Sequence, residues 1–156
     1  MANNLFEDLF TFNCEANNAF IEAMRTHPEA VPDKATVLFC HLLNAQIIWL
    51  DRLRGLPISI TDAWQTYDLD TSERLNEDLT MQSLEYLQSV SDPLRFVRPF
   101  GYQNLAGEST ENLLRDVLIH IVNHGTYHRG QVAMLLKEAG IQPPRTDYVF
   151  MQRLIK

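Results

Sequence analysis

The chain has 156 residues, of which 46% are hydrophobic and 21% are charged, and its formal net charge at pH 7 is -7. This length predicts a single domain over residues 1–156, and the composition is that of an ordinary globular protein. Proteins that neutralise nucleic-acid phosphates carry an excess of basic residues, so the acidic balance argues against a nucleic-acid partner.

The N-terminal stretch MANNLFEDLF is acidic where a secretory signal would be basic. No stretch reaches the ~18 consecutive apolar residues that a membrane span needs, so we expect no membrane partner. The two cysteines, Cys14 and Cys40, form neither a CxxC motif nor a disulfide framework. We therefore expect a cytoplasmic protein, with Cys14 acting as a small buried hydrophobe.

Apolar residues recur at intervals of three and four in the first part of the chain, which predicts an amphipathic helix. They are Leu5, Leu9, Phe12, Ala16, Ala19 and Ala23. Two prolines in THPEAVPDK end this helix, and Asp33 is expected to cap a second helix over residues 34–54. Gly55 and Pro57 then stop the second helix.

The next connection, residues 56–69, has enough apolar residues to dock on the body as an ordered crossover loop. A third helix is predicted to begin at Asp70 or Thr71 and to end before Pro93. Residues 94–107 are aromatic and are flanked by proline and glycine. This pattern predicts an extended excursion that includes a small hairpin.

Ser109 or Thr110 is expected to cap the fourth helix, which runs to about Glu138 before Gly140. The tail that follows, RTDYVFMQRLIK, is apolar enough to pack back on the body. Four long helices without a convincing central strand predict an all-α protein, a four-helix bundle with long crossover loops.

The fourth helix contains the segment HIVNHGTYHRGQ, residues 120–131, with histidines at intervals of four. On a helical wheel His124 and His128 fall within the apolar arc, whereas His120 lies just beyond its edge. Imidazoles at i and i+4 are neighbours that can share one cation, as in the HExxH helix of zinc proteases. Gly125 stands where such a protease has its glutamate, so the protease chemistry is excluded.

A third histidine, His41, shares the apolar face of the second helix. A buried histidine is most often a hydrogen-bonded core residue, but two neutral rings in one apolar patch satisfy each other poorly. A divalent cation would satisfy both. Three protein nitrogens with an open fourth position are the plan of a catalytic metal site. His27, which precedes Pro28, is expected at the surface.

The segment HIVNHGTYHRGQ, together with the histidine of HLLNAQIIWLDRL, resembles the DinB/YfiT-like superfamily of damage-inducible four-helix-bundle proteins. The resemblance covers essentially the whole chain. It implies an up-down-down-up bundle, a homodimer, and a divalent metal ion (zinc or nickel, with iron or manganese as alternatives) held by three histidines. At the matching positions these ligands are His41, His124 and His128, and His120 is expected to support the site rather than to bind the metal.

Some members of this superfamily are thiol S-transferases that use bacillithiol, mycothiol or glutathione, and others are maleylpyruvate isomerases or hydrolases. The resemblance therefore implies a metal-dependent enzyme whose nucleophile is an activated thiolate or water. Its partners would be a low-molecular-weight thiol and an electrophilic small molecule. No acidic residue is tied by sequence to the histidines, which favours thiol transfer over hydrolysis and leaves the catalytic residues unassigned.

Two other interpretations stay open. In the first, the metal holds the second and fourth helices together in a non-catalytic stress-response or binding module. In the second, an acidic residue replaces His41 as a ligand, which gives an iron site of two histidines and one carboxylate. Arg129, at the far edge of the apolar arc, is expected to pair with a carboxylate on a neighbouring helix.

Overall fold

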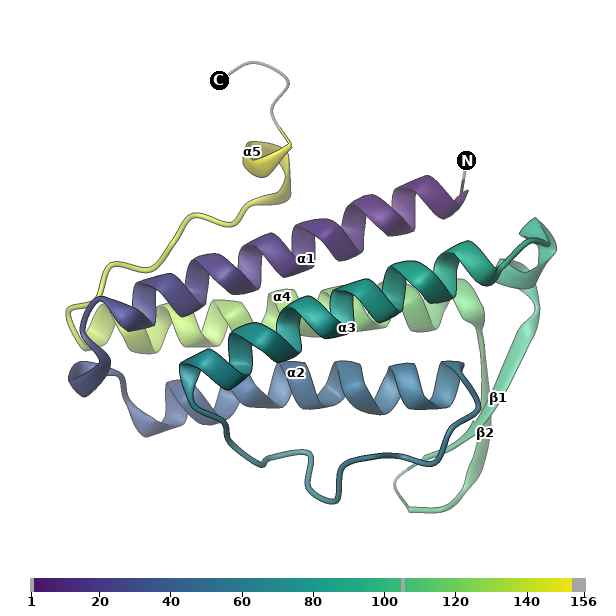
Figure 1. The fold of residues 1–156 in the computed structure, drawn as a ribbon, viewed down its shortest axis with the longest axis horizontal. Helices are drawn as coiled ribbons and strands as arrows, with labels where there is room; N and C mark the ends of the chain where they lie inside the picture. Colours follow the sequence, from purple (N-terminus) through teal and green to yellow (C-terminus); the bar gives the residue numbers. More distant parts are fainter. Residues whose placement is uncertain (1, 105, 153–156) are drawn as a thin grey trace.

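The computed structural model describes residues 2–104 and 106–152. Four long helices make up the body, and these are α1 (Ala2–Arg25), α2 (Asp33–Leu53), α3 (Leu69–Ser89) and α4 (Leu114–Glu138). In Figure 1, α1 and α4 run in one direction and α2 and α3 in the other. The prediction of an all-α, up-down-down-up bundle is therefore confirmed.

The helices pair in a way that brings the histidine-bearing segments together. The packing of α1 is mainly against α3, and that of α2 is mainly against α4. His41 therefore lies on the helix next to the one that carries His124 and His128. Among the described residues, none of the helices combines the length and the apolar composition that a bilayer crossing requires.

The connection between α2 and α3 runs back along the whole bundle beside α2 (Figure 1). Gly55 follows the end of α2 with a φ of 68°, a left-handed conformation that glycine adopts readily, so the predicted stop is confirmed. Asp33 is the first residue of α2 and not its cap; Pro32 takes the cap position without a side-chain hydrogen bond. At the next helix, Asp68 is the cap, and its carboxylate accepts a 2.7 Å hydrogen bond from the Thr71 backbone.

A short 3₁₀ helix, η2 (Pro93–Val97), and an antiparallel hairpin of β1 (Pro99–Gln103) and β2 (Ser109–Leu113) separate α3 from α4. A hairpin is present as predicted, but its second strand lies beyond the predicted range of 94–107, and the predicted capping of α4 at Ser109 or Thr110 was wrong. These residues pair with Gln103 and Tyr102 of β1, and the ladder satisfies their backbone groups. The helix therefore begins only at Leu114.

The bundle interior holds two large apolar clusters, with a polar layer between them along α1 and α4, and a third, small cluster of Phe12, Ala16 and Val122. Buried polar side chains from all four helices form this polar layer. Its members are Asn13, Asn17, Gln46, Asn76, Ser83 and Arg129. Hydrogen bonds link them, as between Asn17 and Asn76 at 2.8 Å. Buried polar groups satisfied in this way fix the alignment of the helices.

The described part of the predicted tail, up to Gln152, contacts the bundle, whereas its end, 153–156, lies outside the described residues. Ile141 is buried in the apolar cluster at that end of the bundle. In the short helix α5 (Tyr148–Met151), the Tyr148 ring meets the Phe12 ring of α1 edge to face, with 5.0 Å between centroids. At the other connection, η1 (Pro28–Ala30) follows α1, and His27 beside it is exposed, which confirms its surface position.

Candidate metal centre

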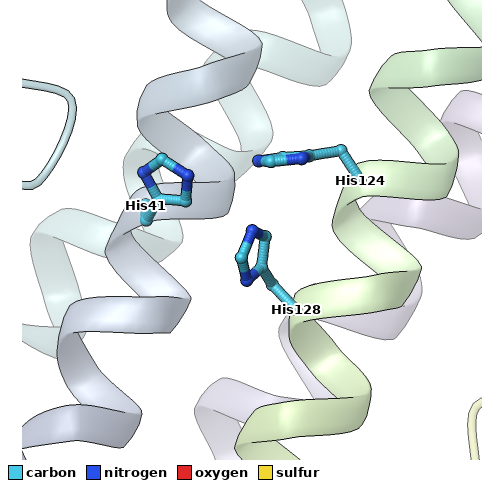
Figure 2. Close-up of side chains that lie close together, drawn as sticks. All are labelled: His41, His124 and His128. Carbon is cyan, nitrogen blue, oxygen red and sulfur yellow. The ribbon is translucent and has the colours of Figure 1, made fainter.

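Three histidines converge between α2 and α4 (Figure 2). Ring centroids lie 5.2 Å apart for His41 and His124, 4.9 Å for His41 and His128, and 4.4 Å for His124 and His128. One ring nitrogen of each residue lies within 4.8 Å of those of the other two. The structure thus brings together all three residues that were predicted as metal ligands. His128 is buried, and the other two are partly exposed.

Local helix geometry explains how one segment supplies two of these rings. His124 and His128 are one turn apart on α4, so their side chains emerge on the same face. That face points to α2 because it also carries Ile121 and Val117, which are buried in the apolar cluster. His41 meets the pair from the opposite helix, close to the middle of α2.

Hydrogen bonds select the tautomer of two of the rings. Nδ1 of His41 lies 2.8 Å from the backbone oxygen of Ala63, and Nδ1 of His128 lies 2.8 Å from Oε1 of Gln131. Both oxygens accept hydrogen bonds, so each Nδ1 carries a proton, and in the neutral form of each ring Nε2 presents a free electron pair. Outer partners of this kind orient metal-binding histidines in many proteins.

The third ring has a nitrogen in need of a partner. Nε2 of His124 is buried and has no hydrogen-bond partner among the described residues. Leaving such a group unsatisfied costs about 1–3 kcal/mol, and a cation between the three rings would remove that cost. Three neutral imidazole nitrogens suit zinc, nickel, copper and iron. The residues present therefore fit a divalent metal ion.

The protonation state also favours metal binding. Burial lowers the pKa of His124 from 6.5 to about 4, with further lowering from the neighbouring His128, His41 and His120. Burial also lowers the pKa of His128, against an opposing effect of its hydrogen bond to Gln131. Both rings are therefore neutral at pH 7, which is the form that binds a metal ion.

The crossover loop covers one side of the centre. The Trp64 ring stacks on the His41 ring with 3.7 Å between centroids and an interplanar angle of 6°. Asn44 of α2 holds this loop, since its Nδ2 donates to the backbone oxygens of Ala63 at 3.2 Å and Gln65 at 2.8 Å. The same asparagine therefore fixes the carbonyl that orients His41.

The other histidine of the segment does not join the cluster. His120 is exposed, and its ring centroid lies 5.4 Å from that of His124 and 5.4 Å from that of Trp49. This placement agrees with a supporting role beside the site. Cys14 is only half-buried, and burial raises the pKa of its thiol, so it does not supply a reactive thiolate.

Arg129 is almost completely buried, with 2% of its surface exposed. The prediction that it pairs with a carboxylate of a neighbouring helix was wrong, because its partners there are amides. Its Nη1 donates to Oδ1 of Asn13 at 2.6 Å and to Oδ1 of Asn17 at 2.7 Å, and its Nη2 donates to the Thr126 hydroxyl. Burial lowers the pKa of this guanidinium to about 10. Two amides at i and i+4 on α1 take the place of the expected carboxylate.

Gly125 makes this packing possible. A Cβ at this position would lie 2.6 Å from Oδ1 of Asn13 and 3.0 Å from Nη1 of Arg129. Any side chain there would push α4 away from α1, so Gly125 has a structural role that its place between two histidines did not reveal.

The cluster contains no acidic residue. Within the described ranges, the group of side chains able to hold a metal ion consists of the three histidines alone. This composition speaks against the iron site of two histidines and one carboxylate, and it identifies no general base beside the centre.

Comparison with known proteins places the chain in a family. The sequence model of the DinB family matches residues 21–155, a range that includes all three histidines. The chain is also 25% identical over 154 residues to Protein DinB of Bacillus subtilis (strain 168), an alignment that covers 90% of this chain and 89% of that protein. With a match over most of its length, the chain belongs to the DinB family.

Proposed function

We propose that this protein is a divalent-metal-dependent transferase of small thiols, with His41, His124 and His128 as the metal ligands. The observation that carries the proposal is the arrangement of the rings. Two of them present Nε2 toward the cluster because Nδ1 is engaged elsewhere, and the third has a buried Nε2 without a partner. Zinc and nickel are the metals that we propose, with iron or manganese as alternatives.

A divalent cation in such a centre turns a thiol or a water molecule into a nucleophile at neutral pH. The chain's own residues prepare the centre for it. Ala63 and Gln131 fix the protons of two rings on Nδ1, and the indole of Trp64 excludes water from one face of His41. Hydrolysis by activated water usually needs a general base, and the cluster has no carboxylate to act as one. We therefore favour a thiol as the nucleophile and a small electrophile as the second substrate.

A non-catalytic role is the second candidate, and one observation favours it. The three histidines come from two different helices, so a cation between them would tie α2 to α4 whether or not any reaction follows. A metal-stabilised binding module would show metal-dependent stability without turnover. A water-activating hydrolase is a further alternative.

The first experiment is elemental analysis of the purified protein and of three variants, His41→Ala, His124→Ala and His128→Ala. We expect about one metal ion per chain in the wild type and its loss in each variant. His120→Ala is the matched control, because this ring lies beside the cluster without belonging to it. Retention of metal by His41→Ala would contradict the three-histidine centre.

The second experiment separates the enzyme from the binding module. The metal-loaded protein is incubated with monochlorobimane and a panel of thiols (glutathione, cysteine and bacillithiol), and the fluorescent conjugate is measured. We expect turnover with at least one thiol that the His124→Ala variant lacks. No turnover with any of them, combined with full metal content, would favour the non-catalytic module. We include a homodimer in the proposal, and light scattering after size-exclusion chromatography tests it.

A further inference from the structure

Arg52 has an unusual environment on the same face of α2 as His41. It follows His41 by eleven positions, which is close to three helical turns, so the two side chains leave the helix in nearly the same direction. Side chains of a helix lean toward its N-terminus. The guanidinium of Arg52 therefore leans along α2 toward the metal centre.

Two aromatic rings flank the guanidinium. Its carbon Cζ lies 4.7 Å from the centroid of the Trp49 ring and 4.9 Å from that of Tyr102, on β1. Its Nε is buried and has no hydrogen-bond partner among the described residues. Burial lowers the pKa of this side chain. The cation is thus partly removed from water without a hydrogen bond at Nε to compensate.

No carboxylate in the described part of the chain neutralises Arg52. The ion pairs of the structure involve other arginines, namely Arg25, Arg98 and Arg115. The adjacent carboxylate, that of Asp51, is engaged elsewhere, because it accepts hydrogen bonds of 2.7 Å from the backbone and the hydroxyl of Ser59. The sequence neighbour of Arg52 therefore does not serve as its counter-ion.

A continuous line of side chains joins this cation to the metal centre. The ring of His124 lies 5.4 Å from that of His120, which in turn lies 5.4 Å from that of Trp49, beside Arg52. His120 is exposed, and Trp49, Arg52 and Tyr102 are partly exposed. A molecule from solvent can therefore touch this line, which we call the Arg52 track.

We infer that Arg52 recognises a carboxylate of the small molecule that enters the open side of the three-histidine centre. This inference rests on the proposed function, since it names the class of thiol that the centre would use. A guanidinium is planar and presents paired N–H donors that match the two oxygens of a carboxylate. The aromatic rings hold its plane, so little conformational freedom remains to be lost on binding.

The spacing defines the size of that molecule. The Cα atoms of His41 and Arg52 are separated by roughly 16 Å along the helix axis, at 1.5 Å per residue, and the lean of the arginine shortens the gap between the functional groups. A single small anion does not span such a distance. A thiol of peptide size, with a carboxylate several bonds away from its sulfur, reaches further and is the class of molecule that we infer.

The test measures binding rather than turnover, by calorimetry on zinc-loaded protein. Glutathione is compared with its diethyl ester, which has the same skeleton without the carboxylates. Arg52→Gln is compared with Arg54→Gln, which removes the same charge from an exposed neighbour whose Nη1 donates to Gln82. We expect Arg52→Gln to weaken glutathione binding about 10- to 100-fold. Arg54→Gln should bind glutathione as tightly as the wild type does. The diethyl ester should bind the wild type more weakly than glutathione does, and Arg52→Gln should not weaken the binding of the ester further.

Three further measurements keep the outcome decisive. Metal content and thermal unfolding of Arg52→Gln show whether the metal centre is intact. If either changes, Arg52→Lys is tested in place of Arg52→Gln, because lysine keeps the positive charge but lacks the planar guanidinium. S-methylglutathione has no free thiol, so its Arg52-dependent binding would support the track even if the transferase assay shows no turnover. Equal binding of glutathione by wild type and Arg52→Gln would overturn the inference, as would no preference of the wild type for glutathione over its diethyl ester. Turnover that is unaffected in Arg52→Gln would leave the transferase standing and remove the track.

Discussion

Replacement of Gly125 by alanine tests how α4 is held against α1. The added Cβ would lie 2.6 Å from Oδ1 of Asn13, far inside ordinary contact distance. Asn13 is not free to move aside, because the same oxygen accepts a 2.6 Å hydrogen bond from Arg129, and its Nδ2 donates to Gln46 at 3.4 Å. We expect Gly125→Ala to break or stretch this buried bond and to separate the two helices locally.

The expected magnitude combines three contributions. Overpacking of an interior site costs about 1–3 kcal/mol, and loss of a hydrogen bond to a charged group costs about 1.5–3 kcal/mol. Alanine is favoured over glycine in a helix by about 1 kcal/mol. The net loss in the free energy of unfolding is therefore about 1.5–5 kcal/mol. For a chain of this size it corresponds to a fall in Tm of roughly 3–20 °C.

Gly130 supplies the matched control, because it lies on the same helix and a Cβ there would meet nothing within 4 Å. Gly130→Ala should gain the helix preference alone, about 1 kcal/mol, or roughly 2–4 °C in Tm. Thermal unfolding of both variants in chelator, followed by circular dichroism, measures the difference without a contribution from metal. A Gly125→Ala protein as stable as the wild type would refute the reasoning, since it would mean that Asn13 and Arg129 adjust without cost.

Three other predictions concern the metal centre. The unfolded chain binds a proton at His124 below its ordinary pKa of 6.5, whereas the folded protein does so only near its lowered pKa of about 4. The contribution of His124 to the stability of the metal-free protein should therefore be lost as the pH drops from 6.5 to 4 and be constant above that range. Urea midpoints should show a smaller fall for His124→Asn, and an equal fall would count against the assignment. Asn44→Ala should weaken metal binding about 10- to 100-fold, because the substitution releases the loop that orients His41. Competition with a chelating dye measures the affinity, and an unchanged affinity would contradict this role of Asn44. Zinc at a hundred times its dissociation constant should stabilise the wild type by about 2.7 kcal/mol, or roughly 5–11 °C in Tm, and should leave His41→Ala unchanged.

The features that the sequence predicted are those that depend on spacing within one helix. Apolar residues repeat at helical intervals over twenty or more positions in α1 and α2, and this is enough to locate a helix and its buried face. The pairing of His124 and His128 follows from the same geometry. His41 could be placed on a buried face of its own helix, and the family resemblance then predicted that it meets the other two.

The features that were missed depend on contacts between distant segments. The helix cap expected at Ser109 or Thr110 became a strand because β1, several residues earlier, offers a partner for the backbone. Asn44 holds the crossover loop through hydrogen bonds to Ala63 and Gln65, which follow it by 19 and 21 positions in the chain. No local sequence pattern encodes contacts over such separations. The partners of Arg129 left a readable sign, since Asn13 and Asn17 are polar residues at a four-residue interval on an otherwise apolar face.

His128 and Arg129 are adjacent in the chain, yet they contact different neighbours of α4. His128 faces His41 of α2, whereas Arg129 reaches Asn13 and Asn17 of α1. The polar layer therefore sets the position of the same turn that presents the imidazoles. A change in the packing of α1 should therefore shift this turn and, with it, the imidazoles of the metal centre, although no residue of α1 belongs to the histidine cluster.

Charge balance links this architecture to the choice of substrate. Three neutral imidazoles leave the charge of a divalent cation uncompensated. Arg129, which follows His128 in the chain, is a buried cation bonded to neutral amides, and Arg52 along the track lacks an ion pair within the described residues. The net charge of the chain is -7, but its acidic groups do not join the cluster. Under the proposed function, such a centre would favour an anion at its open side, and a thiolate that also carries a carboxylate would meet both the cation and Arg52.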